Sequence, residues 1–138
     1  VIDNNQDRLN VKGAAWKHFL PAKWEPEMGQ VFNSRTGIII KQPGRTYRSP
    51  VNVPDDLERS TLQYFVDAGH GESKPRTAFA TMGKQDVYRH MEPIRLMPPC
   101  MGCHGKPKGE PDMLGFEKDG LEPGDVIGLM SVTIGVSD

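Results

Sequence analysis

Two cysteines three positions apart, with a histidine directly after the second, form the stretch of this chain that could carry chemistry: Cys100-Met101-Gly102-Cys103-His104. They are the only two cysteines among the 138 residues. A Cys-x-x-Cys-His sequence is the attachment signature of a c-type haem, because the short loop offers one sulfur to each vinyl group while the next residue brings an imidazole beneath the iron. We therefore predict one covalent haem c on Cys100 and Cys103, with His104 as the proximal iron ligand.

Three other chemistries remain open for the same residues. A Cys-x-x-Cys redox pair needs a thioredoxin-like βαβ context, whereas this pair lies between Pro98-Pro99 and the loop that starts at Gly105. A zinc site would need a ligand in addition to the two cysteines and His104, supplied by one of the other three histidines. A local structural disulfide is the third alternative.

Length and composition favour one domain spanning residues 1–138. The 17 basic and 18 acidic residues nearly cancel, so the chain shows no electrostatic footprint for nucleic acid or for a polybasic membrane contact. No run approaches the roughly 20 apolar residues of a membrane span, so we expect no membrane insertion of this segment. Only 36% of the residues are hydrophobic, while 15 glycines and 12 prolines indicate much loop. A prosthetic group could supply the missing apolar core.

Hydrophobic periodicity predicts an N-terminal helical segment over about residues 1–36. A weak helical pattern covers Ile2 to Leu20. A clearer helix starts near Trp24, with Pro26 in its first turn and Gly37 after its end. Its apolar stripe recurs at helical spacing and is expected to be core; the stripe consists of Trp24, Met28, Val31 and Phe32.

The remaining pattern predicts strands around a third helix. A β-branched run favours a strand over residues 37–42, and Pro54-Asp55-Asp56 opens a helix that ends at Gly69. That helix is expected to bury Leu57, Thr61, Tyr64 or Phe65, and Ala68. Strands are predicted over Thr77–Met82, Asp86–Met97 and Val126–Val136, with a Gly/Pro-rich loop over Pro107–Asp125. The fold class is therefore α+β, an antiparallel sheet with helices packed on one face.

Four spaced motifs carry a resemblance that extends from about Phe19 to the C-terminus. They are Lys41-Gln42 with Tyr47-Arg48-Ser49-Pro50-Val51-Asn52-Val53-Pro54-Asp55, Tyr88-Arg89-His90-Met91-Glu92-Pro93-Ile94, Cys100 to Gly105, and Gly124-Asp125-Val126-Ile127-Gly128. Together they resemble the c-type-haem PAS-like sensor domain family. The resemblance implies a PAS-like antiparallel sheet with N-terminal helices and one covalently attached haem c. Members form extracytoplasmic parts of bacterial chemoreceptors and histidine kinases, and also occur as free-standing haem proteins.

Residue by residue, the resemblance assigns little beyond the attachment motif. It implies thioether bonds at Cys100 and Cys103 and proximal ligation by His104, while Arg48, Tyr88, Arg89 and Met91 occupy motif positions that shape the pocket. We also expect a homodimer through the N-terminal helices.

The sixth iron ligand is the open question of the sequence. His18 is the candidate of most interest, because it lies in the N-terminal helix where some relatives place a distal ligand near a following proline. The alternatives are His70 at a helix exit, His90 on a strand face, and the methionines near the hairpin, which are Met82, Met91, Met97 and Met101. If Phe19, the residue next to His18, fills the equivalent position instead, the site is open. Haem propionates need cationic or hydrogen-bonding partners, for which the candidates are Arg48, Arg95 and Arg45.

Two functions follow from these expectations, and neither is enzymatic, because no catalytic constellation is readable. The first is an extracytoplasmic sensor of redox state or of a diatomic gas. The second is a small periplasmic electron-transfer cytochrome c with a redox partner protein. Thioether attachment takes place outside the cytoplasm, so a periplasmic location is expected. Because the chain begins with Val1 rather than Met, it reads as a processed or excised piece, to which flanking transmembrane helices could provide a tether.

Overall fold

The computed structural model describes residues 21–136. The helix expected within residues 2–20, and with it His18, lies outside the described residues. The described elements, in chain order, are α2 (Pro21–Thr36), β1 (Ile39–Lys41), the 3-10 turn η2 (Pro50–Asn52), α3 (Asp56–Ala68), η3 (Gly69–Gly71), β2 (Arg76–Met82), β3 (Gln85–Arg95), η4 (Pro98–Cys100), α4 (Met101–His104) and β4 (Val126–Gly135).

The four strands form one antiparallel sheet in the order β1-β4-β3-β2, so the first and last strands of the described chain are neighbours. The sheet and the helices confirm the α+β class predicted from the sequence. Pro93 pairs with Leu129 of β4, beyond the last β2 partner of β3, which is Met91. Leu129 donates its N–H to the Pro43 carbonyl oxygen, away from β3, so Pro93 lies in a non-hydrogen-bonded pair and its missing N–H costs no ladder bond.

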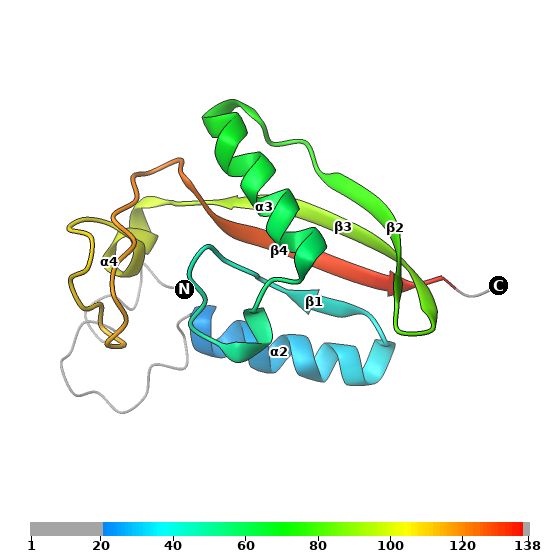
Figure 1. The fold of residues 1–138 in the computed structure, drawn as a ribbon. Helices are drawn as coiled ribbons and strands as arrows, with labels where there is room; N and C mark the ends of the chain where they lie inside the picture. Colours follow the sequence, from blue (N-terminus) through cyan, green and yellow to red (C-terminus); the bar gives the residue numbers. More distant parts are fainter. Residues whose placement is uncertain (1–20, 137–138) are drawn as a thin grey trace.

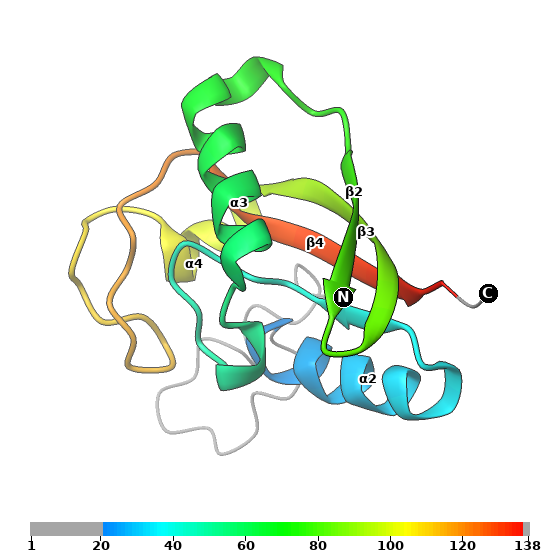
Figure 2. The same ribbon diagram turned by 45° about the vertical axis from the view of Figure 1, so that its right-hand side comes forward.

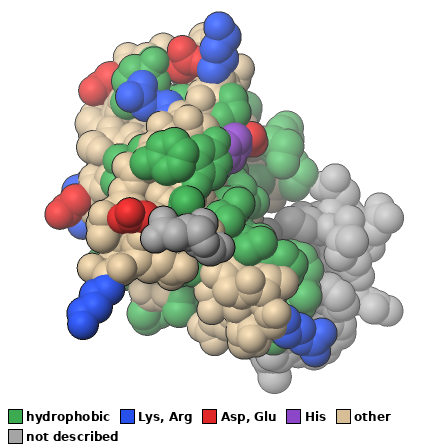
Figure 3. All heavy atoms as spheres, turned by 90° about the vertical axis from the view of Figure 1, so that its right-hand side faces the viewer, with side chains coloured by type: hydrophobic (Ala, Val, Ile, Leu, Met, Phe, Trp, Pro, Cys, Tyr) green, Lys and Arg blue, Asp and Glu red, His purple; other side chains and the backbone are tan. Residues whose placement is uncertain are grey.

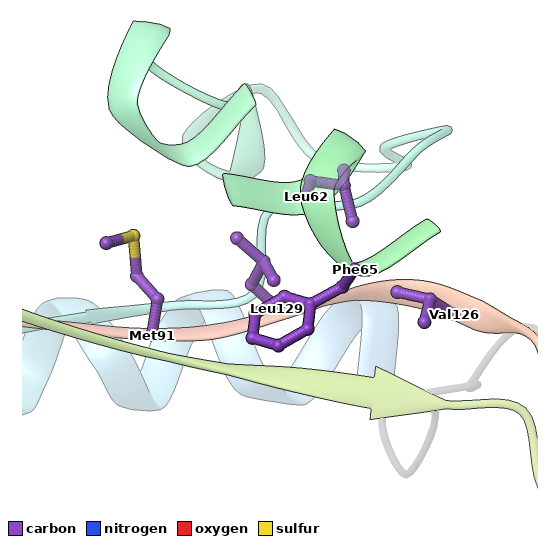
Figure 4. Packing of buried hydrophobic residues seen from close by; sticks show 5 residues of the cluster. All are labelled: Leu62, Phe65, Met91, Val126 and Leu129. Atoms are coloured by element: carbon purple, nitrogen blue, oxygen red, sulfur yellow. The ribbon is translucent and has the colours of Figure 1, made fainter. Parts of the chain in front are cut away.

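Helix α3 crosses the face made by β3 and β4 and covers the hydrophobic core (Figures 1 and 2). The core side chains point into the space between helix and sheet (Figure 4); they are Leu62, Phe65, Met91, Val126 and Leu129. Of the residues predicted for the buried face of this helix, Thr61 and Phe65 are buried, whereas Tyr64 is 41% exposed and Ala68 is exposed.

A charged network lies under the first turn of α3. The Arg89 guanidinium donates to Asp55 at 2.9 Å and to Glu58 at 2.8 Å, and Lys41 forms an ion pair with Glu58 at 2.8 Å. Glu58 and Arg89 are both buried, so each charge has a partner where an unpaired one would be costly. Arg89 therefore has a structural role in the sheet rather than a place in a pocket.

The stripe on α2 contradicts the expectation that it is core. Trp24, Met28, Val31 and Phe32 are 55%, 47%, 45% and 40% exposed. The helix turns its other side to β1, where a Cβ at Gly29 would lie 2.7 Å from the carbonyl oxygen of Ile40. This close approach admits only small side chains, so the apolar stripe faces outward.

The ends of α2 also differ in part from the prediction. The helix begins at Pro21, which places Pro26 inside it rather than in its first turn. Its end is as predicted: Gly37 follows with a φ of +72°, a backbone conformation that favours glycine after a helix. Among the described residues, no helix is long and apolar enough to cross a membrane.

Candidate functional site

The Cys-x-x-Cys-His motif occupies a short helical turn at the end of the sheet away from the β2–β3 hairpin (Figure 1). The chain leaves β3 at Arg95, and two backbone hydrogen bonds fix it to the start of β4, from Leu96 N–H to Asp125 and from Gly124 N–H to Leu96. The prolines Pro98 and Pro99 open the turn, as their fixed φ allows. The motif thus lies in the connection between β3 and β4, the two inner strands of the sheet.

Helix α4 is only four residues long because the chain turns away at Gly105. A Cβ at this position would lie 2.6 Å from the Met101 carbonyl oxygen, so only glycine fits directly after His104. A thioredoxin-like redox pair requires a βαβ setting, which a single turn followed by a loop does not provide. The structure around the motif therefore does not favour the thioredoxin-like redox pair.

His104 is held from its Nδ1 side by the loop that follows the motif. Its Nδ1 forms a hydrogen bond with an Asp119 carboxylate oxygen, and the other oxygen accepts from the Thr46 hydroxyl. The Leu121 N–H donates to the His104 carbonyl oxygen at 2.9 Å. A carboxylate acceptor at Nδ1 fixes the imidazole tautomer that carries hydrogen on Nδ1, so the Nε2 lone pair is available to a metal.

Arg48 lies against the same ring without blocking Nε2. Its Nη1 is 3.4 Å from Nδ1 and 3.5 Å from Nε2 of His104. A position nearly equidistant from both nitrogens lies over the ring or beyond the carbon between them, not along the Nε2 lone pair. Its Nη2 donates to the Cys103 carbonyl oxygen at 2.8 Å, its Nε donates to Asp112 at 2.9 Å, and the guanidinium lies 5.6 Å from the Phe116 ring centroid.

Cys103 keeps its proton at neutral pH. Burial, reinforced by the negative charge and hydrogen bond of Asp112, raises the pKa of this thiol to about 11. Metal-binding and redox-active cysteines instead have lowered pKa values, because the thiolate is the ligand and nucleophile. Among the described residues, no group of three or more His, Cys, Asp or Glu side chains could hold a metal ion. Both cysteines are free thiols, so the disulfide alternative is not realised in the structure.

The donor set fits a covalently attached haem better than the alternatives. Two half-buried thiols and an imidazole with a free Nε2 share one turn. Large apolar side chains next to the residues that meet there are exposed, as expected for surface that an apolar macrocycle would cover; they are Tyr47, Met97 and Phe116.

The structure brings Arg48 to the motif but not the other residues proposed for the pocket. Tyr88 lies seven residues before the end of β3, which is roughly 20 Å of strand, and its ring packs on Phe79 at 5.5 Å. Met91 is a core residue, 1% exposed. The guanidinium of Arg95 donates to backbone carbonyls of Gly69, Glu72 and Gly124. Arg95 therefore stabilises these loops, and its donors are already used and do not point to a haem propionate.

The other histidines of the described chain have their own partners. His70 pairs with Asp125 at 3.1 Å, and His90 pairs with Glu92 at 2.9 Å on the sheet surface. Arg45 donates through its backbone N–H to Ile127. The distal candidate His18 stays a prediction, since it is not among the described residues.

Sequence reasoning missed three residues that support the motif: Thr46, Asp112 and Asp119. Two of them, Asp112 and Asp119, lie in the loop Pro107–Asp125, whose glycines and prolines predict a loop but no functional residue. The available signal was Asp112 three residues before Gly115, a turn pattern. Asp112 indeed accepts from the backbone N–H groups of Leu114 and Phe116 at 2.7 and 3.1 Å.

Comparisons with known proteins bear on the family and the fold. A family model described as Tll0287-like matches residues 2–135, almost the whole chain. Among solved structures, the crystal structure of the cyanobacterial heme-protein Tll0287 matches with a TM-score of 0.59 and 21% sequence identity. The match covers 97% of this chain and 88% of that chain, and at this identity it supports the fold alone. A search of curated proteins found no match.

Proposed function

This chain belongs to the Tll0287-like family, and on that premise we propose that it is a monohaem c-type cytochrome domain acting as an extracytoplasmic redox or diatomic-gas sensor. One observation carries the haem assignment. Cys100, Cys103 and His104 share a single turn in which the imidazole is held by Asp119 through Nδ1, leaving Nε2 for iron. That the solved relative is titled a heme-protein supports the same assignment.

Each residue of the motif has a definite role in the proposed holoprotein. Each thiol would add across one vinyl group, forming a sulfur–carbon bond while the thiol hydrogen passes to the neighbouring carbon, with no net oxidation. His104 would bind the iron through Nε2, while Arg48 ties the motif backbone to Asp112. The haem would supply a redox-active iron that can take a further ligand.

The choice of a sensor rests on the distal position and on the sheet. Among the described residues, both other histidines are engaged elsewhere, which favours an exchangeable position. The antiparallel sheet, in which the edge strand β1 pairs with the last described strand, β4, supports the PAS-like sheet that the sequence resemblance implies. The alternative, a periplasmic electron-transfer cytochrome, requires a strong sixth ligand such as His18. A periplasmic location, a binding rather than catalytic role, and tethering by flanking transmembrane helices belong to the same proposal.

Expression with a c-type maturation system tests the haem. We expect haem-linked peroxidase staining on a denaturing gel for the wild type, and none for the Cys100→Ala/Cys103→Ala variant expressed in the same way. Absence of stain from the matured wild type would exclude covalent haem.

The ferrous absorption spectrum with and without carbon monoxide then separates the two functions. A sensor with an exchangeable position should show a marked spectral change on adding carbon monoxide. A six-coordinate low-spin spectrum that does not change would favour electron transfer, and an altered spectrum in His18→Ala would identify His18 as the sixth ligand.

A further inference from the structure

We propose that Asp119 is the positioning residue that sets the donor strength of His104 and thereby lowers the reduction potential of the haem. The inference rests on the proposed function and deepens it, because it assigns the electronic control of the same site to a residue outside the motif. Asp119 reaches His104 from the loop Pro107–Asp125, fifteen positions along the chain.

Both carboxylate oxygens of Asp119 form hydrogen bonds. One faces Nδ1 of His104 and the other accepts from the Thr46 hydroxyl, and the side chain is only 9% exposed. The backbone beside it is also fixed, because Gly120 N–H donates to the Gly105 carbonyl at 3.1 Å and Leu121 N–H donates to the His104 carbonyl at 2.9 Å. Two short segments therefore run paired, and they hold the carboxylate at the imidazole.

Among the described residues, no lysine or arginine forms an ion pair with the Asp119 carboxylate that lies against His104. Arg48 touches the same ring, but its guanidinium forms an ion pair with Asp112, whose side chain is fully buried. The described part of the site thus consists of one Arg48–Asp112 ion pair and one carboxylate, Asp119, that pairs with His104 from its Nδ1 side.

A carboxylate at Nδ1 makes a ligating imidazole more basic than a neutral acceptor does. A more basic axial ligand stabilises the ferric over the ferrous iron, and hydrogen bonding around the ligands is one of the means by which proteins set haem potentials. The domain should therefore favour the oxidised haem. It should also keep a strong iron–histidine bond when a ligand binds on the other side.

The test compares haem-loaded Asp119→Asn with the wild type by redox titration and by resonance Raman spectroscopy. Asparagine keeps the size of the side chain and removes its charge, so we expect a higher reduction potential and a lower ferrous iron–histidine stretching frequency. Asp119→Glu, which restores the charge, should move both values back toward the wild type. Glu117→Gln removes an exposed charge from the same loop and should leave both values unchanged.

The outcomes separate this inference from the proposed function. Loaded Asp119→Asn with wild-type potential and stretching frequency overturns the inference while the haem assignment stands. A matured wild type without covalent haem overturns both. If Asp119→Asn does not load, Thr46→Val decides the question: without the hydroxyl, more of the carboxylate charge acts on His104, so the potential should fall. An unchanged or raised potential in Thr46→Val would contradict the role of Asp119.

Discussion

At the scale of single residues, Glu25 is a buried carboxyl group with only one of its two oxygens hydrogen-bonded among the described residues. It is 7% exposed on the side of α2 that faces away from the apolar stripe. Its Oε2 accepts from the Asn52 side-chain amide at 2.9 Å, whereas its Oε1 is buried and unpartnered. Burial raises the pKa of Glu25 above its ordinary value of 4.5, although the bond from Asn52 opposes the shift. Ionisation of this carboxyl group therefore lowers the stability of the folded protein.

The first prediction concerns the pH dependence of stability. Because the pKa of Glu25 is higher in the folded than in the unfolded chain, its contribution is fully present below pH 4.5 and is lost as the pH rises through the folded value. Glu25→Gln should therefore raise the free energy of unfolding at pH 7 by about 1 kcal/mol, and this gain should vanish near pH 4. Urea unfolding at the two pH values measures it.

The control for this prediction is Glu27→Gln, an exposed glutamate two positions along. It should change the free energy of unfolding little at either pH. A Glu25→Gln variant that is less stable than the wild type at pH 7 would show that the ionised carboxylate is needed.

At the scale of elements, α3 joins local capping to the charged network in the sheet. Asp55 accepts from the Glu58 N–H at 2.8 Å, and Glu58 in turn accepts from the Asp55 N–H at 3.0 Å, which is a capping box. The remaining Asp55 oxygen accepts from Arg89. Although burial disfavours its ionised form, the Glu58 N–H and the Arg89 guanidinium lower the pKa of Asp55. One side chain thus starts the helix and ties it to β3.

The second prediction separates these two roles. Asp55→Ala removes both the cap and the charge and should cost about 2 kcal/mol of unfolding free energy, whereas Asp55→Asn keeps the cap and should cost less. Since the pKa of Asp55 is lowered, the charge-dependent part is present above pH 3.8 and is lost as the pH falls through the folded value. Chemical unfolding at pH 7 and pH 3 measures both parts, and equal losses in the two variants would contradict the capping role.

At the scale of the whole molecule, the described chain buries one compact core and leaves a second apolar surface outside. The stripe of α2 is exposed, and hydrophobic side chains also gather on the face that carries the hairpin and the end of β4 (Figure 3). The exposed residues of those strands include Phe79, at 79%, and Ile134. Extended exposed apolar surface of this kind is typical of interfaces.

The third prediction is therefore the homodimer expected from the sequence, formed through α2. The stripe can bury itself against its own copy across a two-fold axis, where identical apolar patches are self-complementary. Trp24→Glu/Phe32→Glu should convert a dimer to a monomer in light scattering while circular dichroism is unchanged. Gln30→Glu, at an exposed polar position of the same helix, should leave the dimer intact. A wild type that is monomeric at every concentration would refute the dimer.

The sequence alone determined the features that depend on neighbouring residues. The attachment motif, the strand over residues 126–136, the hairpin and the helix that opens at Pro54-Asp55-Asp56 all follow from spacing, propensity and turn chemistry, and the described elements agree with them closely. The same local rules place Cys100, Cys103 and His104 on one turn, because five consecutive residues cannot lie far apart.

Only the tertiary structure decided which distant residues meet, because a side chain's partners depend on how segments cross and not on their order. It brought Thr46, Arg48 and Asp119 to His104. It placed Tyr88 far along β3 from the motif, against Phe79, and it buried Met91 in the core. It also turned the apolar stripe of α2 outward, because β1 admits only the small residue Gly29 at the contact. Periodicity identifies an apolar face, but the shape of the neighbouring element decides whether that face is buried.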